Sequence, residues 1–107
     1  SEEYGMAILH TVNKSPFERV ALDSCLGHAL EGSGVLLIED AIFAAMAGTN
    51  MESKMKEAMQ GRNFYVLGPD VQARGLSEDN VIDGIKVVDY EGFVDLVTEY
   101  DKVQSWL

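Results

Sequence analysis

Short apolar runs, rich in β-branched residues, alternate with helix-type segments along this 107-residue chain. Two runs have the character of buried strands, at residues 7–12 and 35–38, and residues 64–67 and 85–88 should form a third and a fourth strand. Glycine or proline separates most of these segments, as expected at element boundaries. Apolar strands that alternate with helices are typical of a parallel sheet covered on both faces. The sequence therefore predicts one α/β domain of three layers, with a mostly parallel sheet of four to five strands.

The first two helices are predicted from residues suited to helix ends. Ser15 and Pro16 fit the cap and first position of a helix that should run to about Leu30. Asp40 precedes the small, apolar residues 41–47 and should cap a short helix there.

Two further helices follow the same logic. Asn50 should cap a helix that runs to about Gln60, and Asp89 one over residues 90–100. Between them, residues 70–73 allow at most one helical turn. The last helix carries an apolar stripe at spacings of three and four residues, formed by Phe93, Leu96, Val97, Tyr100 and Val103.

The charge balance argues against several classes of partner. Eight Lys and Arg face eighteen Asp and Glu, giving a net charge of −10. Such a surface repels phosphate backbones, and no local cluster of basic residues offsets it. We therefore expect no direct nucleic-acid binding, whereas a basic protein partner remains compatible. No apolar run approaches the roughly 20 residues of a membrane span, so we expect no membrane insertion.

A single cysteine and no secretory signal favour the reducing cytoplasm. We expect residues 1–5 to be a cloning remnant ahead of a natural start at Met6, so that the domain spans residues 6–107.

Cys25 is the only cysteine, so it is either a packing residue or a thiol that reacts with another molecule. It lies about 60° from the centre of its helix's apolar stripe, at a border that permits partial exposure. His28, one turn further on, would either lower the thiol pKa or stay solvated. Both readings of Cys25 stay open at this stage.

The carboxyl ends of the predicted strands should gather at one edge of the sheet, where ligand sites of such folds lie. The residues expected there are His10, Thr11, Asn13, Glu39, Asp40, Gly68, Asp70 and Asp89. A flavin phosphate is an alternative for the loop after the first strand, but that loop lacks glycine, and helix capping by Asn13 and Ser15 is simpler. The Glu39-Asp40 pair resembles that of a receiver domain but follows the second strand. His10 is expected to be a hydrogen-bonded structural residue. One cysteine and two distant histidines have no metal-ligand spacing.

Several segments taken together resemble the DsrH/TusB family, and DsrH in particular. They are residues 8–17, the Glu39-Asp40 turn with its small-residue helix, residues 65–76, residues 88–96 and the terminal Trp106. The resemblance covers the chain from Met6 onward. It implies a flavodoxin-like fold of the DsrEFH type.

The resemblance also implies a function. Family members are the small subunit of a cytoplasmic heterohexamer with DsrE-like and DsrF-like subunits, which passes persulfide sulfur from donor to acceptor proteins. The DsrH branch serves sulfur oxidation, whereas the TusB branch serves thiolation of the tRNA wobble uridine. The best-attested carrier cysteine lies on the DsrE/TusD subunit, but DsrH proteins have one where Cys25 stands. Cys25 is therefore a candidate persulfide carrier that needs no metal or organic cofactor, with a non-catalytic scaffold subunit as the alternative.

Overall fold

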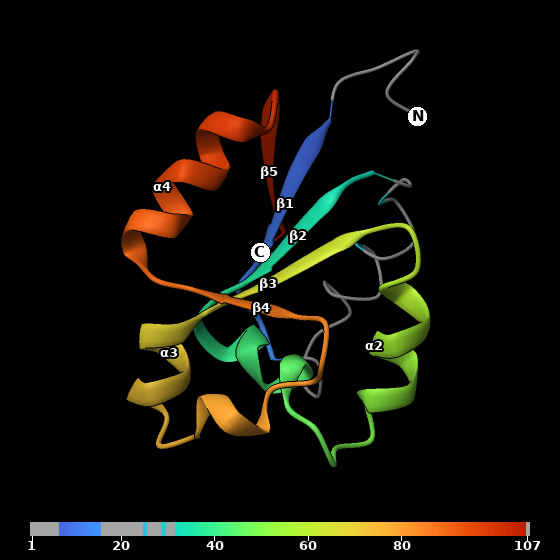
Figure 1. The fold of residues 1–107 in the computed structure, drawn as a ribbon, viewed down its shortest axis with the longest axis vertical. Coiled ribbons are helices and arrows are strands. Elements are labelled where there is room, and N and C mark those ends of the chain that lie inside the picture. Colours follow the sequence, from blue (N-terminus) through green and yellow to red (C-terminus); the bar gives the residue numbers. More distant parts are fainter. Residues whose placement is uncertain (1–6, 16–24, 26–28, 30–31, 107) are drawn as a thin grey trace.

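A computed structural model of the chain describes residues 7–15, 25, 29 and 32–106. In this part of the chain, five parallel strands form one sheet in the order β4-β3-β2-β1-β5 (Figure 1). Their bounds are Ile8–Val12 (β1), Gly34–Leu37 (β2), Asn63–Leu67 (β3), Lys86–Val88 (β4) and Lys102–Trp106 (β5). The predicted α/β class with a parallel sheet is confirmed.

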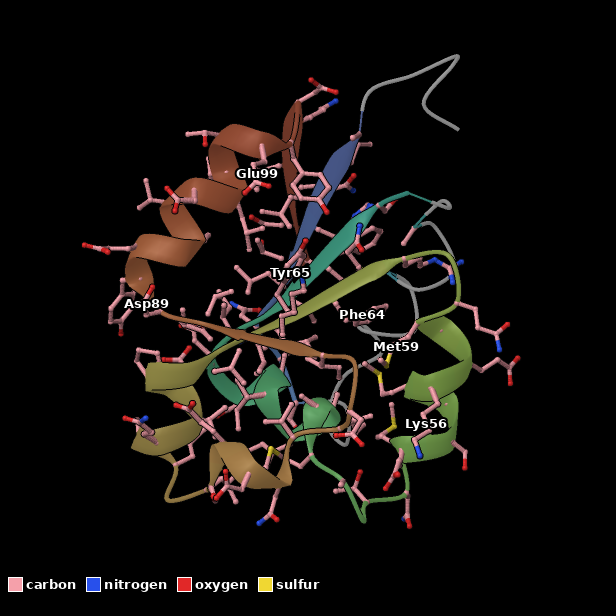
Figure 2. All side chains as sticks on the ribbon, viewed as in Figure 1. Lys56, Met59, Phe64, Tyr65, Asp89 and Glu99 are labelled. Carbon is pink, nitrogen blue, oxygen red and sulfur yellow. The ribbon has the colours of Figure 1, made fainter. Side chains whose placement is uncertain are left out.

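Helical segments cover the two faces of the sheet. Their bounds are Glu39–Ala45 (η1, a 3-10 helix), Glu52–Ala58 (α2), Gly68–Ala73 (α3), Glu78–Asn80 (η2, a 3-10 turn) and Tyr90–Glu99 (α4). Figures 1 and 2 show α4 on one side of the sheet and η1, α2 and α3 on the other. Beneath α4, Leu96 packs with Leu9 and Leu36 in the smaller core cluster. The larger cluster, on the opposite face, includes Met55 of α2 and Val71 of α3. The structure thus has the expected three layers.

The order of the strands explains which edges of the sheet are open. From β1 to β4 each new strand pairs beside the previous one, and α4 then carries the chain across to β5 on the far side of β1. β4 and β5 are therefore the two edge strands. The carboxyl ends of all five strands lie along the same side of the sheet, across the strand direction, because every pairing is parallel. This side is called the carboxyl edge.

The four predicted strands match β1 to β4 within one residue at every end. The predicted cap of the last helix is also confirmed, since the Asp89 carboxylate accepts a hydrogen bond of 2.8 Å from the Gly92 N–H. This bond satisfies one of the amide groups that a helix start leaves without a partner.

The helix predicted over residues 41–47 is wrong in type and in its cap. A 3-10 helix, η1, begins earlier, and Ile38 stands at its N-cap position without a side-chain bond. The Asp40 carboxylate instead forms an ion pair of 2.9 Å with Arg74. Four apolar residues of η1 are buried, so core packing outweighs local capping here.

The cap predicted at Asn50 is also wrong. α2 begins at Glu52, with Met51 at the N-cap position and no side-chain bond from it. The preceding turn is held by two other side chains. The Thr49 hydroxyl accepts from the Met51 N–H at 3.2 Å, and the Glu52 carboxylate accepts from the Gly48 N–H at 2.6 Å.

The apolar stripe assigned to the last helix is wrong at Val103, which lies in β5. α4 ends at Glu99, and the chain then turns through Asp101. The Asp101 N–H donates to the Ala7 carbonyl at 2.9 Å, and its carboxylate accepts from the Ala7 N–H at 3.0 Å. These bonds align β5 beside β1.

The helix predicted from Pro16 to Leu30 falls mostly outside the described residues. Cys25, within it, is helical, and its carbonyl accepts a bond of 2.8 Å from the Ala29 N–H, as in an α-helix. No helix in the described part of the chain combines the length and apolar character that crossing a membrane requires.

Candidate functional site

Cys25 lies in the larger core cluster, on the face of the sheet opposite α4. Its side chain is fully buried, with 0% of its surface exposed. Its cluster includes Val12 of β1, Val35 and Leu37 of β2, and Ala29 one turn further along. The helical border position left burial and partial exposure open, and in the single chain the thiol is buried.

Burial also sets the acidity of the thiol. It raises the pKa of Cys25 to about 12, and the positive charge of Arg62 acts in the opposite direction to a smaller extent. A buried thiolate is unfavourable because its charge loses hydration. At neutral pH the thiol is therefore protonated, and it is the thiolate that attacks sulfur.

Arg62 connects the Cys25 segment to α2. Its Nε donates to the Ala29 carbonyl at 2.8 Å, and its Nη1 donates to the Ala58 carbonyl at 2.9 Å. The guanidinium thus satisfies one carbonyl near the end of α2 and one just beyond Cys25. It is also the cation whose charge favours a Cys25 thiolate. Arg62 was not predicted from the sequence. Its only signal was its position just after the helix-ending Gly61, where a basic side chain can bond the last helix carbonyls.

A hollow of about 330 Å³ lies on the α2 side of this region, lined by Lys54, Glu57, Ala58 and Arg62. His28, the predicted neighbour of Cys25, lies outside the described residues. The structure therefore adds Arg62 to the surroundings of Cys25 and leaves the His28 interaction a prediction.

Asp40 and Asp70, at the carboxyl edge of the sheet, form structural bonds within the chain. The Asp70 carboxylate accepts a bond of 2.6 Å from the Glu39 N–H, and Asp40 pairs with Arg74. Glu39 has a φ of +50°, a conformation that side chains other than glycine seldom adopt. The bond that the Asp70 carboxylate accepts supports this turn between β2 and η1.

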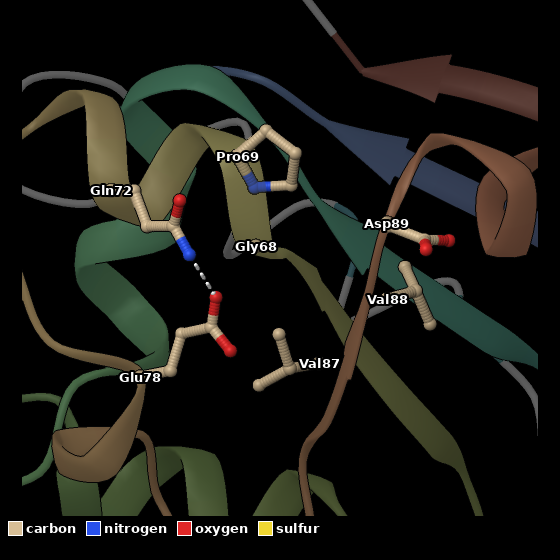
Figure 3. A pocket seen from close by; sticks show the side chains of 7 residues that line it. All are labelled: Gly68, Pro69, Gln72, Glu78, Val87, Val88 and Asp89. Atoms are coloured by element: carbon tan, nitrogen blue, oxygen red, sulfur yellow. Dashed lines mark hydrogen bonds between the residues drawn. The ribbon is translucent and has the colours of Figure 1, made fainter.

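No group of three or more His, Cys, Asp or Glu suited to a metal ion occurs among residues 7–15, 25, 29 and 32–106. A shallow hollow of about 420 Å³ lies at the carboxyl ends of β3 and β4. Figure 3 shows its lining residues: Gly68, Pro69, Gln72, Glu78, Val87, Val88 and Asp89. Within it the Glu78 carboxylate accepts a bond of 2.6 Å from Gln72. Asp89 also lines this hollow but is engaged in capping α4.

His10 is a buried structural residue, as predicted, with 2% of its surface exposed. Its Nδ1 accepts a bond of 3.0 Å from the Trp106 indole, and the two ring centres lie 6.1 Å apart. Thr11 likewise donates from its hydroxyl to that of Ser105 at 3.2 Å. Both pairs join β1 to β5, and no local sequence pattern predicts them because the partners are more than ninety positions apart.

Comparisons with known proteins agree with this fold. Residues 14–103 match the family described as DsrH like protein. The chain is 32% identical over 99 residues to Protein TusB of Pectobacterium parmentieri, and 31% identical over 101 residues to Protein TusB of Escherichia coli strain K12. Each match covers 92% of this chain and 100% of the relative.

Solved structures show the same architecture. The crystal structure of the ychN protein from E. coli superimposes with a TM-score of 0.79 at 20% identity, covering 94% of this chain and 99% of that one. MTH1491 from Methanobacterium thermoautotrophicum, titled a protein of unknown function, gives a TM-score of 0.68 at 14% identity with the same coverage. These two likenesses concern the fold alone. The family match and the full-length relatives go further: the chain belongs to the DsrH/TusB family, whose members work in sulfur-relay complexes with other subunits.

Proposed function

We propose that this chain is a scaffold subunit of a cytoplasmic sulfur-relay complex, assembled with DsrE-like and DsrF-like subunits that carry the sulfur. Family membership supports the relay. The observation that carries the scaffold role is the state of Cys25, which is 0% exposed and has a pKa raised to about 12 by burial. A buried, protonated thiol is a poor nucleophile, so sulfur transfer falls to cysteines of the partners.

The proposal also concerns the pathway that receives the sulfur, either tRNA thiolation or sulfur oxidation. Relatives named TusB, 31% to 34% identical, favour the relay that thiolates the tRNA wobble uridine. The cysteine in the first helix favours the sulfur-oxidation relay instead, by resemblance to DsrH. Deleting the gene in its host distinguishes them: loss of 2-thiouridine with normal sulfur oxidation supports the first branch, and the reverse result supports the second.

A second candidate role is that Cys25 carries persulfide within the assembled complex. Arg62 favours it, because its charge lowers the thiol pKa. In this reaction the Cys25 thiolate attacks the outer sulfur of a donor persulfide, R–S–SH. A new S–S bond forms on Cys25, the donor S–S bond breaks, and the donor leaves as the thiolate R–S⁻. Assembly would have to open a path to the thiol.

Replacing Cys25 by Ser in the co-purified complex tests the two roles. The scaffold role predicts that the Cys25→Ser complex assembles and transfers sulfur at the wild-type rate. Loss of transfer with intact assembly would establish the carrier role instead. If the chain does not co-purify with either partner subunit, membership of such a complex is rejected.

A further inference from the structure

Four of the five large apolar side chains that are exposed in the described residues gather on α4 and β5. They are Tyr90, Val94, Val97 and Val103, with 61%, 62%, 40% and 40% of their surfaces exposed. We call these four residues the α4–β5 surface. The fifth, Val87 at 37%, lies on β4 at the opposite edge of the sheet. Apolar residues exposed singly are ordinary, whereas a cluster marks an interaction site.

The three α4 members of this surface form one stripe along the helix. At about 100° per residue, Tyr90, Val94 and Val97 fall within an arc of about 60°. Phe93 and Leu96, which pack onto the sheet, lie about 40° and 100° from the near end of this arc. α4 therefore has two adjoining apolar faces, of which only one packs into a core cluster among the described residues.

The direction of the stripe follows from the opposite flank of α4. Burial, the Tyr100 hydroxyl and then the negative charge of Glu99 raise the pKa of Tyr65, so Glu99 lies toward β3. Val97 is about 160° around the helix from Glu99. The stripe consequently faces the other way, toward the β1 and β5 side of the sheet.

Val103 extends the stripe onto the sheet. It pairs in register with Leu9, whose side chain packs with Leu96 beneath α4, so Val103 points to the α4 side of the sheet. β5 is an edge strand, and its residues from Lys102 to Ser105 are all exposed. Parallel strands are normally covered on both faces. The exposed stripe of α4 and the exposed edge strand β5 together make up the α4–β5 surface.

The charges around the α4–β5 surface decide which kind of protein can cover it. Two carboxylates of α4 border the stripe, because Glu91 and Asp95 lie about 60° and 100° around the helix from Val94. A second copy of this chain, with a net charge of −10, would bring matching acidic rims together. Like charges facing each other across an interface are unfavourable. The charge pattern fits a different protein with an apolar contact centre and a rim of Lys and Arg.

We propose that the α4–β5 surface docks a different subunit of the relay, through an apolar contact face bordered by basic residues. The inference rests on the proposed function, because that function supplies the partner subunits. It adds the place of contact and the chemistry of the partner's face. The core of the contact is apolar, and the acidic rim of α4 directs association and excludes self-association.

The test uses the full chain co-expressed with DsrE-like and DsrF-like subunits. The probe variant combines Val94→Lys and Val97→Lys, and Val87→Lys at the opposite edge is the matched control. Lysine has a better helix propensity than valine, so α4 should keep its fold, which circular dichroism and thermal unfolding verify. We expect the probe variant to bind at least about 30-fold more weakly, and the control to bind like wild type.

The charged rim is tested separately with Glu91→Gln and Asp95→Asn. We expect slower association and a weaker dependence of the association rate on salt, with little change in dissociation.

Each other outcome overturns a defined part of the proposal. If wild type binds and the probe variant binds equally well, the docking surface is wrong while the proposed function stands. If wild type binds neither subunit, the proposed function fails, and this choice of partner fails with it. If the isolated wild-type chain dimerises and the probe variant is monomeric in sedimentation experiments, the occupant is a second copy and the heterologous partner is rejected.

Discussion

The indole N–H of Trp106 donates a hydrogen bond of 3.0 Å to Nδ1 of His10 and joins the last strand to the first. An accepting imidazole nitrogen carries no proton, so this bond fixes Nδ1 of His10 in its deprotonated form. Because His10 is almost fully buried, the bond also satisfies a polar atom that water reaches poorly. This bond therefore links the edge strand β5 to a buried side chain of β1.

Replacing Trp106 by Phe should destabilise the chain. The substitution removes the indole donor from a buried acceptor, and we expect the free energy of unfolding to fall by about 1–3 kcal/mol. Urea unfolding measures this, with Gln104→Ala on the same exposed strand as a control expected to change little. Equal stabilities of Trp106→Phe and wild type would show that the bond contributes nothing.

Gly34 lies against the tyrosine at the end of α4. A Cβ added there would lie 2.5 Å from the Tyr100 hydroxyl oxygen and 3.1 Å from a Leu9 methyl carbon. We expect Gly34→Ala to lower the free energy of unfolding by about 1–3 kcal/mol through overpacking. In a Tyr100→Ala background the same substitution should cost much less, as a double-mutant cycle would show. A cost independent of Tyr100 would place the strain elsewhere.

The raised pKa of Cys25 predicts a slow reaction with thiol reagents. Burial moves the pKa from an ordinary value of about 9 to about 12, which lowers the thiolate fraction at neutral pH about 1000-fold. Alkylation by iodoacetamide should therefore be slow in the folded chain and rapid in guanidinium chloride. A folded chain that is alkylated at the rate of the unfolded one would contradict the burial of Cys25.

The same pKa shift predicts how stability depends on pH. Between about pH 9 and 12 the unfolded thiol loses its proton while the folded one keeps it. The unfolded state then binds fewer protons, so stability falls as pH rises, by up to about 1.4 kcal/mol per pH unit. Cys25→Ala should lose this component, and the difference between its pH profile and that of wild type isolates it from other groups. Parallel profiles above pH 9 would contradict it.

Arg62→Met should loosen the contact between α2 and the Cys25 segment. The change keeps an unbranched side chain but removes the donors to the Ala29 and Ala58 carbonyls. We expect a loss of about 1–3 kcal/mol in the free energy of unfolding and faster hydrogen exchange in α2. Lys56→Met, within α2 and 58% exposed, is the control and should cost less than about 1 kcal/mol. Wild-type exchange in Arg62→Met would mean that Arg62 does not hold these segments together.

The sequence predicted the elements whose signals are local. β1 to β4 are short, largely apolar runs, and the Asp89 cap precedes an amphipathic helix, so the sequence pattern agrees with these elements. β5 was missed because Val103 continues the helical spacing by chance, whereas long-range pairing with Leu9 decides its state. The wrong caps at Asp40 and Asn50 have a similar cause. Asp40 is drawn to Arg74, 34 positions away, and the turn before α2 is held by Thr49 and Glu52 instead.

The surroundings of the candidate thiol were less predictable. A helical wheel places Cys25 at a border, and only tertiary packing decides whether a border residue is covered. Arg62, which lies 37 positions later, has no spacing relation to Cys25 that a sequence pattern could reveal. The direction of the α4 stripe was likewise hidden, because both of its apolar faces contribute to one periodic signal.

The most direct test of the scaffold role is the intact mass of each subunit after the assembled complex has reacted with a persulfide donor. We predict a gain of one sulfur atom on a partner subunit and none on this chain, in wild type and in Cys25→Ser alike. A sulfur adduct on this chain that disappears in Cys25→Ser would contradict the scaffold role and make Cys25 a carrier.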